Sequence, residues 1–265
     1  MPAALALSGP FATEPDSWHP ATLLETVRAA EQAGLPFVIL PDRIAAADGT
    51  GAWPDATLLA AWLAASTQTI GFLAATSAVG HQPYNLARRI ASLDIISGGR
   101  TGWFVRNDDE ANERAAFSGA TRLPEGNSAE RIAEFVSVVR GLWQSWDADA
   151  LLLDRESGRF LDPSKMHVLN HQGPHFSVQG PLNVMRSPQD LPVLAVDGGT
   201  RDAEADLVIT PNTFTIRGSD SEPHTLLVVE NPAEAARLLA SGPNDSPPKQ
   251  ATLRSRLGLI KETRS

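Results

Sequence analysis

Residues 69–105, TIGFLAATSAVGHQPYNLARRIASLDIISGGRTGWFV, decide the fold class because they contain one complete β–α–β unit. The apolar run Thr69–Ala75 predicts a buried strand, and a second run at Thr101–Val105 predicts its parallel neighbour. Between them, Pro83–Ile96 carries apolar residues at helical spacing and begins with a proline, which suits a first helical turn. The pair Gly98–Gly99 then predicts a tight turn from the helix into the second strand.

The same alternation of short apolar runs and longer amphipathic segments continues on both sides of this unit. Such a rhythm is typical of an α/β protein with a parallel sheet, and it predicts a (β/α)8 barrel of the TIM type. The further predicted strands are Ala3–Leu7, Pro36–Leu40, Leu191–Val196, Asp206–Thr210 and Thr225–Val229, and the further predicted helices are Pro20–Ala33, Pro54–Ser66, Ser128–Trp146 and Pro232–Ala240.

The second half of the chain departs from this regular pattern. Residues 147–190 contain turn formers and hairpin-like pieces without a helical period, so they predict an insertion before the fifth strand. The residues from 192 to 265 are too few for four complete strand–helix units of roughly 31 residues each. We therefore expect one barrel domain over residues 1–265 that is incomplete or has reduced helices in its second half, with a loop and tail at 241–265.

Composition excludes several classes of function. The formal net charge of -9 disfavours nucleic acid as a partner, because a phosphate backbone is bound through clustered lysines and arginines. The absence of cysteine excludes disulfides and thiolate metal sites. No apolar run approaches the roughly 18 residues of a membrane span, and the apolar first residues lack the basic region of a secretory signal. We expect a cytoplasmic protein.

Three segments resemble a known family: QPYNLARRIASLDIISGGRTGW (82–103), LWQSW (142–146) and HQGPHFSVQGPLNVMRSPQDLPVL (171–194). They are similar to the nitrilotriacetate and sulfone monooxygenase branch of the bacterial-luciferase-like, flavin-dependent monooxygenases, and the likeness covers most of residues 1–210. The resemblance implies a barrel shortened in its C-terminal half. It also implies a two-component enzyme, in which a separate flavin reductase supplies reduced FMN that reacts with oxygen and oxidises a small organic substrate.

Ligands of such barrels bind at the carboxyl ends of the strands, so the residues that follow each predicted strand are the candidates for contacts. A Gly-Gly-Thr turn offers backbone N–H groups to the FMN phosphate, and the fork of an arginine suits the same group. An aspartate after a strand either contacts the flavin or caps the following loop. The expected cofactor contacts are Asp42, Thr76, Arg106, Asn107, Gly198, Gly199 and Thr200, and the expected substrate pocket contains Trp18, Trp53 and Phe104.

Several positions depart from the family pattern. Phe104 stands where the family has a polar flavin contact, Ser128 and Ile132 replace a His and a Tyr, and Asp197 brings a negative charge close to the expected phosphate. The sequence assigns no catalytic acid or base and leaves flavin binding open. Two hypotheses follow: an FMN-dependent monooxygenase, or a non-catalytic paralogue that stores a flavin or stabilises a partner subunit. Apolar faces left uncovered by a shortened barrel predict a homodimer or a heterodimer.

Histidines 167, 171 and 175 are spaced four apart, which on a helix would form a metal-binding face. Gly173 and Pro174 interrupt any such helix, so the sequence predicts no metal site.

Overall fold

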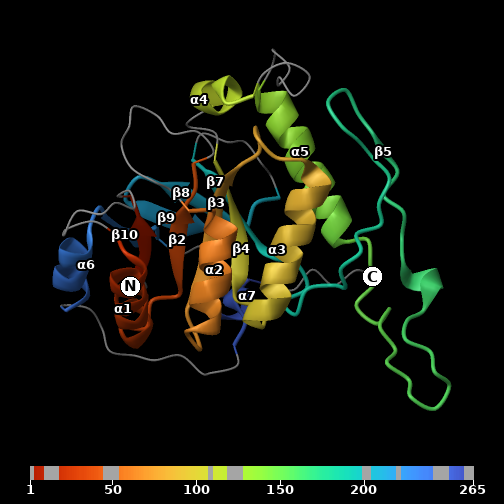
Figure 1. Cartoon of the computed structure of the whole chain (residues 1–265), viewed down its shortest axis with the longest axis horizontal. Coiled ribbons are helices and arrows are strands. Elements are labelled where there is room, and N and C mark those ends of the chain that lie inside the picture. Colours follow the sequence, from red (N-terminus) through yellow and green to blue (C-terminus); the bar gives the residue numbers. More distant parts are fainter. Residues whose placement is uncertain are drawn as a thin grey trace.

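The computed structural model describes residues 3–8, 18–43, 54–106, 110–117, 128–198, 204–218, 222–240 and 251–259. Its strands form one closed barrel with helices packed outside it (Figure 1). Around the barrel the strand order is β1, β2, β3, β4, β7, β8, β9 and β10, which returns to β1. These strands are β1 (Ala3–Leu7), β2 (Phe37–Pro41), β3 (Gly71–Ser77), β4 (Thr101–Arg106), β7 (Val193–Asp197), β8 (Leu207–Thr210), β9 (Thr213–Ile216) and β10 (His224–Val229).

The barrel confirms the predicted fold class, including the reduced helices of the second half. Neighbouring strands run parallel, except that β9 is antiparallel to both β8 and β10. The helices are α1 (Pro20–Gln32), α2 (Ala56–Ala65), α3 (Pro83–Ser97), α4 (Glu110–Ala115), α5 (Ser128–Trp143), α6 (Pro232–Leu239) and α7 (Leu253–Arg256).

The strand β9 was not predicted, and it explains how a short second half still closes the barrel. Residues 211–212 join β8 directly to β9, and the described residues between β7 and β10 contain no helix. Phe214 of β9 points into the barrel and is buried, whereas Thr213 and Thr215 on its other face are half-buried. An antiparallel strand tolerates one polar face, so this side of the barrel needs no covering helix.

Two layers of apolar side chains follow from the alternation of residues along each strand. The inner layer fills the lower part of the barrel, where Phe37 and Phe214 meet edge to face with ring centroids 5.0 Å apart. The outer layer lies between the strands and the helices, where the Trp103 ring lies 5.8 Å from the Phe135 ring of α5. This division determines which side chains after each strand reach the barrel axis.

The short helix α7 closes the barrel at the amino-terminal ends of its strands. Leu253 and Leu257 belong to the inner apolar layer. Arg254 forms a two-pronged ion pair with Asp206, with both N–O distances 2.8 Å, and Arg256 donates to backbone carbonyls that include Leu35 O at 3.0 Å. The prediction of loop and tail for 241–265 is therefore wrong at α7, because a four-residue helix is too short to show a hydrophobic period.

The segment between α5 and β7 leaves the barrel and runs beside α5 (Figure 1). It contains a short 3-10 helix at Pro163–Lys165 and a small antiparallel pair, β5 (His171–Gln172) and β6 (Ser177–Val178). Glu134 of α5 holds this pair, because its carboxylate accepts the backbone N–H groups of His175 and Phe176. None of the described helices is both long and apolar enough to cross a membrane.

Candidate functional site

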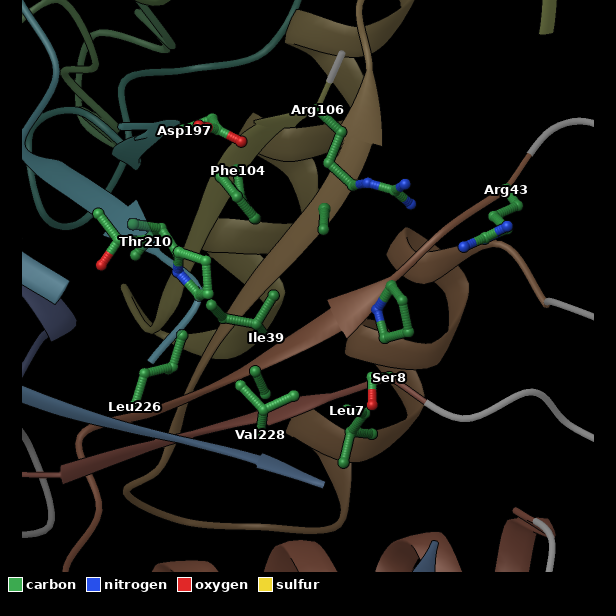
Figure 2. Close-up of a pocket in the computed structure, with 15 residues that line it drawn as sticks. Leu7, Ser8, Ile39, Arg43, Phe104, Arg106, Asp197, Thr210, Leu226 and Val228 are labelled. Carbon is green, nitrogen blue, oxygen red and sulfur yellow. The ribbon is translucent and has the colours of Figure 1, made fainter. Parts of the chain in front are cut away.

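A cavity of about 350 Å³ lies at the end of the barrel where the parallel strands finish (Figure 2). Barrel proteins bind their ligands at this rim, and small-molecule sites typically measure ~300–1,000 Å³. Every strand of the barrel except β9 contributes to its lining, directly or through the residues that follow the strand. Its apolar walls are formed mainly by Ala6, Ile39, Ala75, Phe104, Leu226 and Val228.

The cavity exists because small side chains occupy the upper positions of the inner layer. Phe37 and Leu73 fill the lower barrel, but two residues further along the same strands stand Ile39 and Ala75, which line the cavity. On β1 the corresponding upper residue is Ala6. Alternation with a period of two thus brings one side chain per strand to the axis, and the alanines leave room for a ligand there.

Three charged side chains line the mouth of this cavity: Arg43 after β2, Arg106 at the end of β4, and Asp197 at the end of β7. Figure 2 shows the two guanidinium groups on one side, pointing toward one another, and Asp197 on the other side of Phe104. Arg106 Nη1 donates to the Asp42 backbone oxygen at 2.5 Å, which fixes its guanidinium toward β2. The described lining of the mouth therefore has two basic side chains on one side and an acidic side chain on the other.

Asp42 lies beside the cavity but does not line it. Alternation along β2 turns its side chain toward α2, where it accepts a hydrogen bond from the Ala56 backbone. Burial, with repulsion from Asp55, raises the pKa of the Asp42 carboxyl to about 6. The side chain thus joins β2 to the start of α2, while its backbone oxygen orients Arg106.

Two other predicted contacts face the helix layer. Thr76 lies between Ala75 and Ser77 on β3, and it is fully buried outside the cavity lining. Its backbone oxygen accepts the Trp103 indole N–H at 3.1 Å, while its hydroxyl has no partner among the described residues. Trp18 is likewise buried in the outer layer rather than at the cavity. The prediction for Thr76 did not consider the alternation along β3, which turns this residue to the helix layer, and Trp18 lies beside the start of α1 rather than at the end of a strand.

The turn expected to bind phosphate is only partly described. The Gly198 N–H donates to Ile209 O at 2.8 Å, so the sheet already uses this amide. The predicted contacts Trp53, Asn107, Gly199 and Thr200 lie outside the described residues.

Neither Phe104 nor Ile132, two of the side chains that depart from the family pattern, fills the mouth. Phe104 forms one wall of the cavity, whereas Ile132 is buried in the outer layer on α5. Space remains beside the ring because the small side chains of Ala6 and Ala75 line the same cavity, and Ala75 is the register partner of Phe104 on β3.

The sequence did contain a signal for Arg43, which was not among the predicted contacts. Ile39, Pro41 and Arg43 are two residues apart, and all three line the cavity. Continuing the alternation beyond the predicted end of this strand identifies the arginine.

The three spaced histidines lie in the segment beside α5, away from the barrel mouth. His171 Nε2 lies 2.9 Å from a Glu134 carboxylate oxygen, and His167 Nε2 lies 3.0 Å from Asp147. They thus pair with different acids, and the described residues hold no group of three potential metal ligands.

This closed, mixed barrel with a cavity at its carboxyl mouth defines an α/β-barrel protein. The family model described as luciferase-like monooxygenase matches residues 4–210. The chain belongs to the luciferase-like monooxygenase family.

Relatives in this family include proteins named as subunits or components of larger systems. One subunit of pristinamycin IIA synthase from Streptomyces pristinaespiralis is 41% identical over 244 residues, which cover 92% of this chain and 79% of that relative. Another subunit of the same synthase, which we call the second synthase subunit, is 36% identical over 144 residues. These residues cover 54% of this chain and 29% of that relative. The first component of nitrilotriacetate monooxygenase from Aminobacter aminovorans is 38% identical over 193 residues, 66% of this chain and 42% of that relative.

A solved structure has the same fold. Riboflavin lyase, crystallised with a modified FMN and riboflavin, aligns with a TM-score of 0.66 and 32% identity, covering 76% of this chain and 50% of that protein. The chain thus spans most of one relative but half or less of the others.

Proposed function

We propose that the protein binds FMN in the mouth cavity and acts as the monooxygenase component of a two-component system on a small organic substrate. The observation that carries this proposal is the cavity of about 350 Å³, open at the carboxyl rim of a luciferase-like barrel. Reduced FMN would come from a separate reductase, which we propose the protein meets in the cytoplasm. Bound FMN would supply the electrons for the reaction with oxygen.

The residues present fit such a cofactor. Ala6, Ala75 and Phe104 form walls that exclude water and can lie against a flat aromatic ring system. Arg106 offers a guanidinium to an anionic group at the rim, and its hydrogen bond to the Asp42 backbone oxygen orients it beforehand. The residues directly after β4 and β7, namely Asn107, Gly199 and Thr200, are proposed as further contacts, with Trp53 beside the substrate.

A titration of the purified protein with FMN tests this proposal. Under anaerobic conditions, FMN reduced with dithionite is expected to bind saturably with one flavin per chain, followed by flavin absorbance and fluorescence. Supplying reduced FMN from an added reductase in air is then expected to support oxidation of an organic sulfide or sulfone probe. Absence of flavin binding at any concentration tested would refute the enzymatic proposal.

A second candidate function, a partner subunit of a larger oxygenase, is favoured by an exposed apolar face. Leu58 and Trp62 of α2 and Ile96 of α3 are 69%, 37% and 65% exposed; we call these three the α2–α3 face. The α2 sequence, ATLLAAWLAA, is apolar on every side, and such a helix is normally buried on every side. Likeness to two subunits of one synthase agrees with assembly through this face.

Charge favours a different chain over a second copy as the occupant. Arg88 lies in the groove beside the α2–α3 face and forms no ion pair within the described ranges. Asp55, at the start of α2, is already paired with Arg89 at 3.0 Å. A second copy would therefore bring another arginine rather than a carboxylate, so we propose a luciferase-like partner that carries an acidic residue opposite Arg88.

Sedimentation velocity tests this assembly. The chain alone is expected to remain a monomer and to form a one-to-one complex with the second synthase subunit of Streptomyces pristinaespiralis as a probe. Leu58→Glu is expected to abolish the complex, because it places a charge in an apolar contact. Leu153→Glu, on another exposed leucine in the segment beside α5, serves as the control and is expected to leave the complex intact. A homodimer disrupted by Leu58→Glu, or no complex at all, would contradict the proposal.

A further inference from the structure

The described start of the turn after β7, Asp197 and Gly198, is poorly suited to bind an anion. Its Gly198 amide is engaged with Ile209 O, and the preceding residue, Asp197, presents a carboxylate to the cavity. A dianionic phosphate placed there would have one donor fewer and a like charge beside it. The negative side of the mouth is thus the side where the family resemblance predicts the phosphate.

The opposite side of the mouth carries the positively charged side chains. In the β4–β7 register Val105 pairs with Val196, so Arg106 and Asp197 occupy the next positions on neighbouring strands. Nevertheless, Arg106 turns away from β7 and donates to the Asp42 backbone oxygen beyond β3. Its guanidinium therefore lies on the same side as that of Arg43 (Figure 2).

Two guanidinium groups on one side of an apolar cavity create a positive potential that water screens less than at an open surface. Each guanidinium presents a planar fork of donors that matches the oxygens of a phosphate. We propose that Arg43 and Arg106 together bind the phosphate of FMN, and that Asp197 repels this group from the end of β7. This inference rests on the proposed binding of a flavin in the cavity, and it places the phosphate on the β2–β4 side of the mouth.

Comparing FMN with riboflavin isolates the phosphate, because the two flavins differ only in that group. Dissociation constants are measured by fluorescence titration for both flavins, oxidised and reduced. FMN is expected to bind the unaltered protein at least about 10-fold more tightly than riboflavin. Arg43→Gln and Arg106→Gln are each expected to weaken the binding of FMN about 10-fold and to leave the affinity for riboflavin unchanged. Arg155→Gln, which removes an exposed arginine of the segment beside α5, is the charge-matched control.

The experiment distinguishes a failure of this inference from a failure of the proposed function. Riboflavin binding checks that every variant is folded, and Arg43→Gln spares the hydrogen bond that Arg106 makes to Asp42. Equal affinity for FMN and riboflavin would overturn the inference while leaving flavin binding in place. The inference would also be overturned if Asp197→Asn strongly lowered the dissociation constant for FMN while the arginine variants left it unchanged. The phosphate would then lie at the end of β7. If neither flavin binds, the proposed function fails and this inference fails with it.

Discussion

Arg254→Ala is expected to lower the free energy of unfolding by about 3–5 kcal/mol, the largest loss of stability expected from one substitution in this protein. Arg254 is 5% exposed, and both of its terminal nitrogens lie 2.8 Å from the Asp206 carboxylate. The same carboxylate accepts the Leu194 backbone N–H at 2.8 Å, which ties α7 to the start of β7. Without the arginine, Asp206 keeps a buried charge that nothing neutralises.

Urea denaturation followed by circular dichroism measures this loss. Arg155→Ala, at an exposed position, is expected to change the free energy of unfolding by less than about 0.5 kcal/mol. The double variant Arg254→Met with Asp206→Leu is expected to lose less than Arg254→Ala, because it leaves no unpaired charge. A loss below about 1 kcal/mol for Arg254→Ala would show that the ion pair does not hold the barrel closed.

Ala75→Phe is expected to weaken flavin binding at least about 100-fold by filling the cavity. Ala75 lines the cavity floor on β3 and points to the barrel axis, so a phenyl ring at this position occupies the space available to a ligand. The measurement is the anaerobic titration with reduced FMN described for the proposed function.

Ala21→Phe is the matched control, because it adds the same ring at an exposed position of α1. It is expected to leave flavin affinity unchanged. The thermal midpoint of Ala75→Phe is measured in parallel, since added volume that fits into an existing cavity is expected to leave the fold intact. Unchanged flavin affinity in a folded Ala75→Phe protein would place the flavin outside the barrel mouth and refute the proposed site.

The first half of the barrel was predictable because each short apolar strand there is followed by a longer segment of helical length, and α1 and α3 are also amphipathic. The strands β1 to β4 and the helices α1 to α3 agree with the predicted segments to within a few residues. The cavity position also followed from the rule that ligands bind at carboxyl strand ends. Arg106 and Phe104 both line the cavity, because alternation along β4 turns both side chains inward, and their contacts with a flavin or a substrate stay predictions.

The remainder depends on contacts between residues far apart in the sequence. The strand β9 is four residues long, and its identity as a strand depends on pairing with β8 and β10. The helix α7 is stabilised by Asp206 and by carbonyls near residue 35 rather than by its own propensity. Thr76 was misplaced because the position of a residue at a strand end does not by itself determine which face its side chain occupies, and Trp18 was misplaced because it lies beside the start of α1.

The insertion of Leu253 into the lower barrel has a consequence for synthesis on the ribosome. During synthesis, β1 cannot pair with β10 until Val229, the partner of Leu7, has been made. The inner core stays incomplete until residues 253–257 follow. Strands that lack their pairing partner expose unpaired edges and apolar surface, and aggregation starts from these features. Production of soluble protein should therefore depend on chaperones that hold the nascent chain until α7 has emerged.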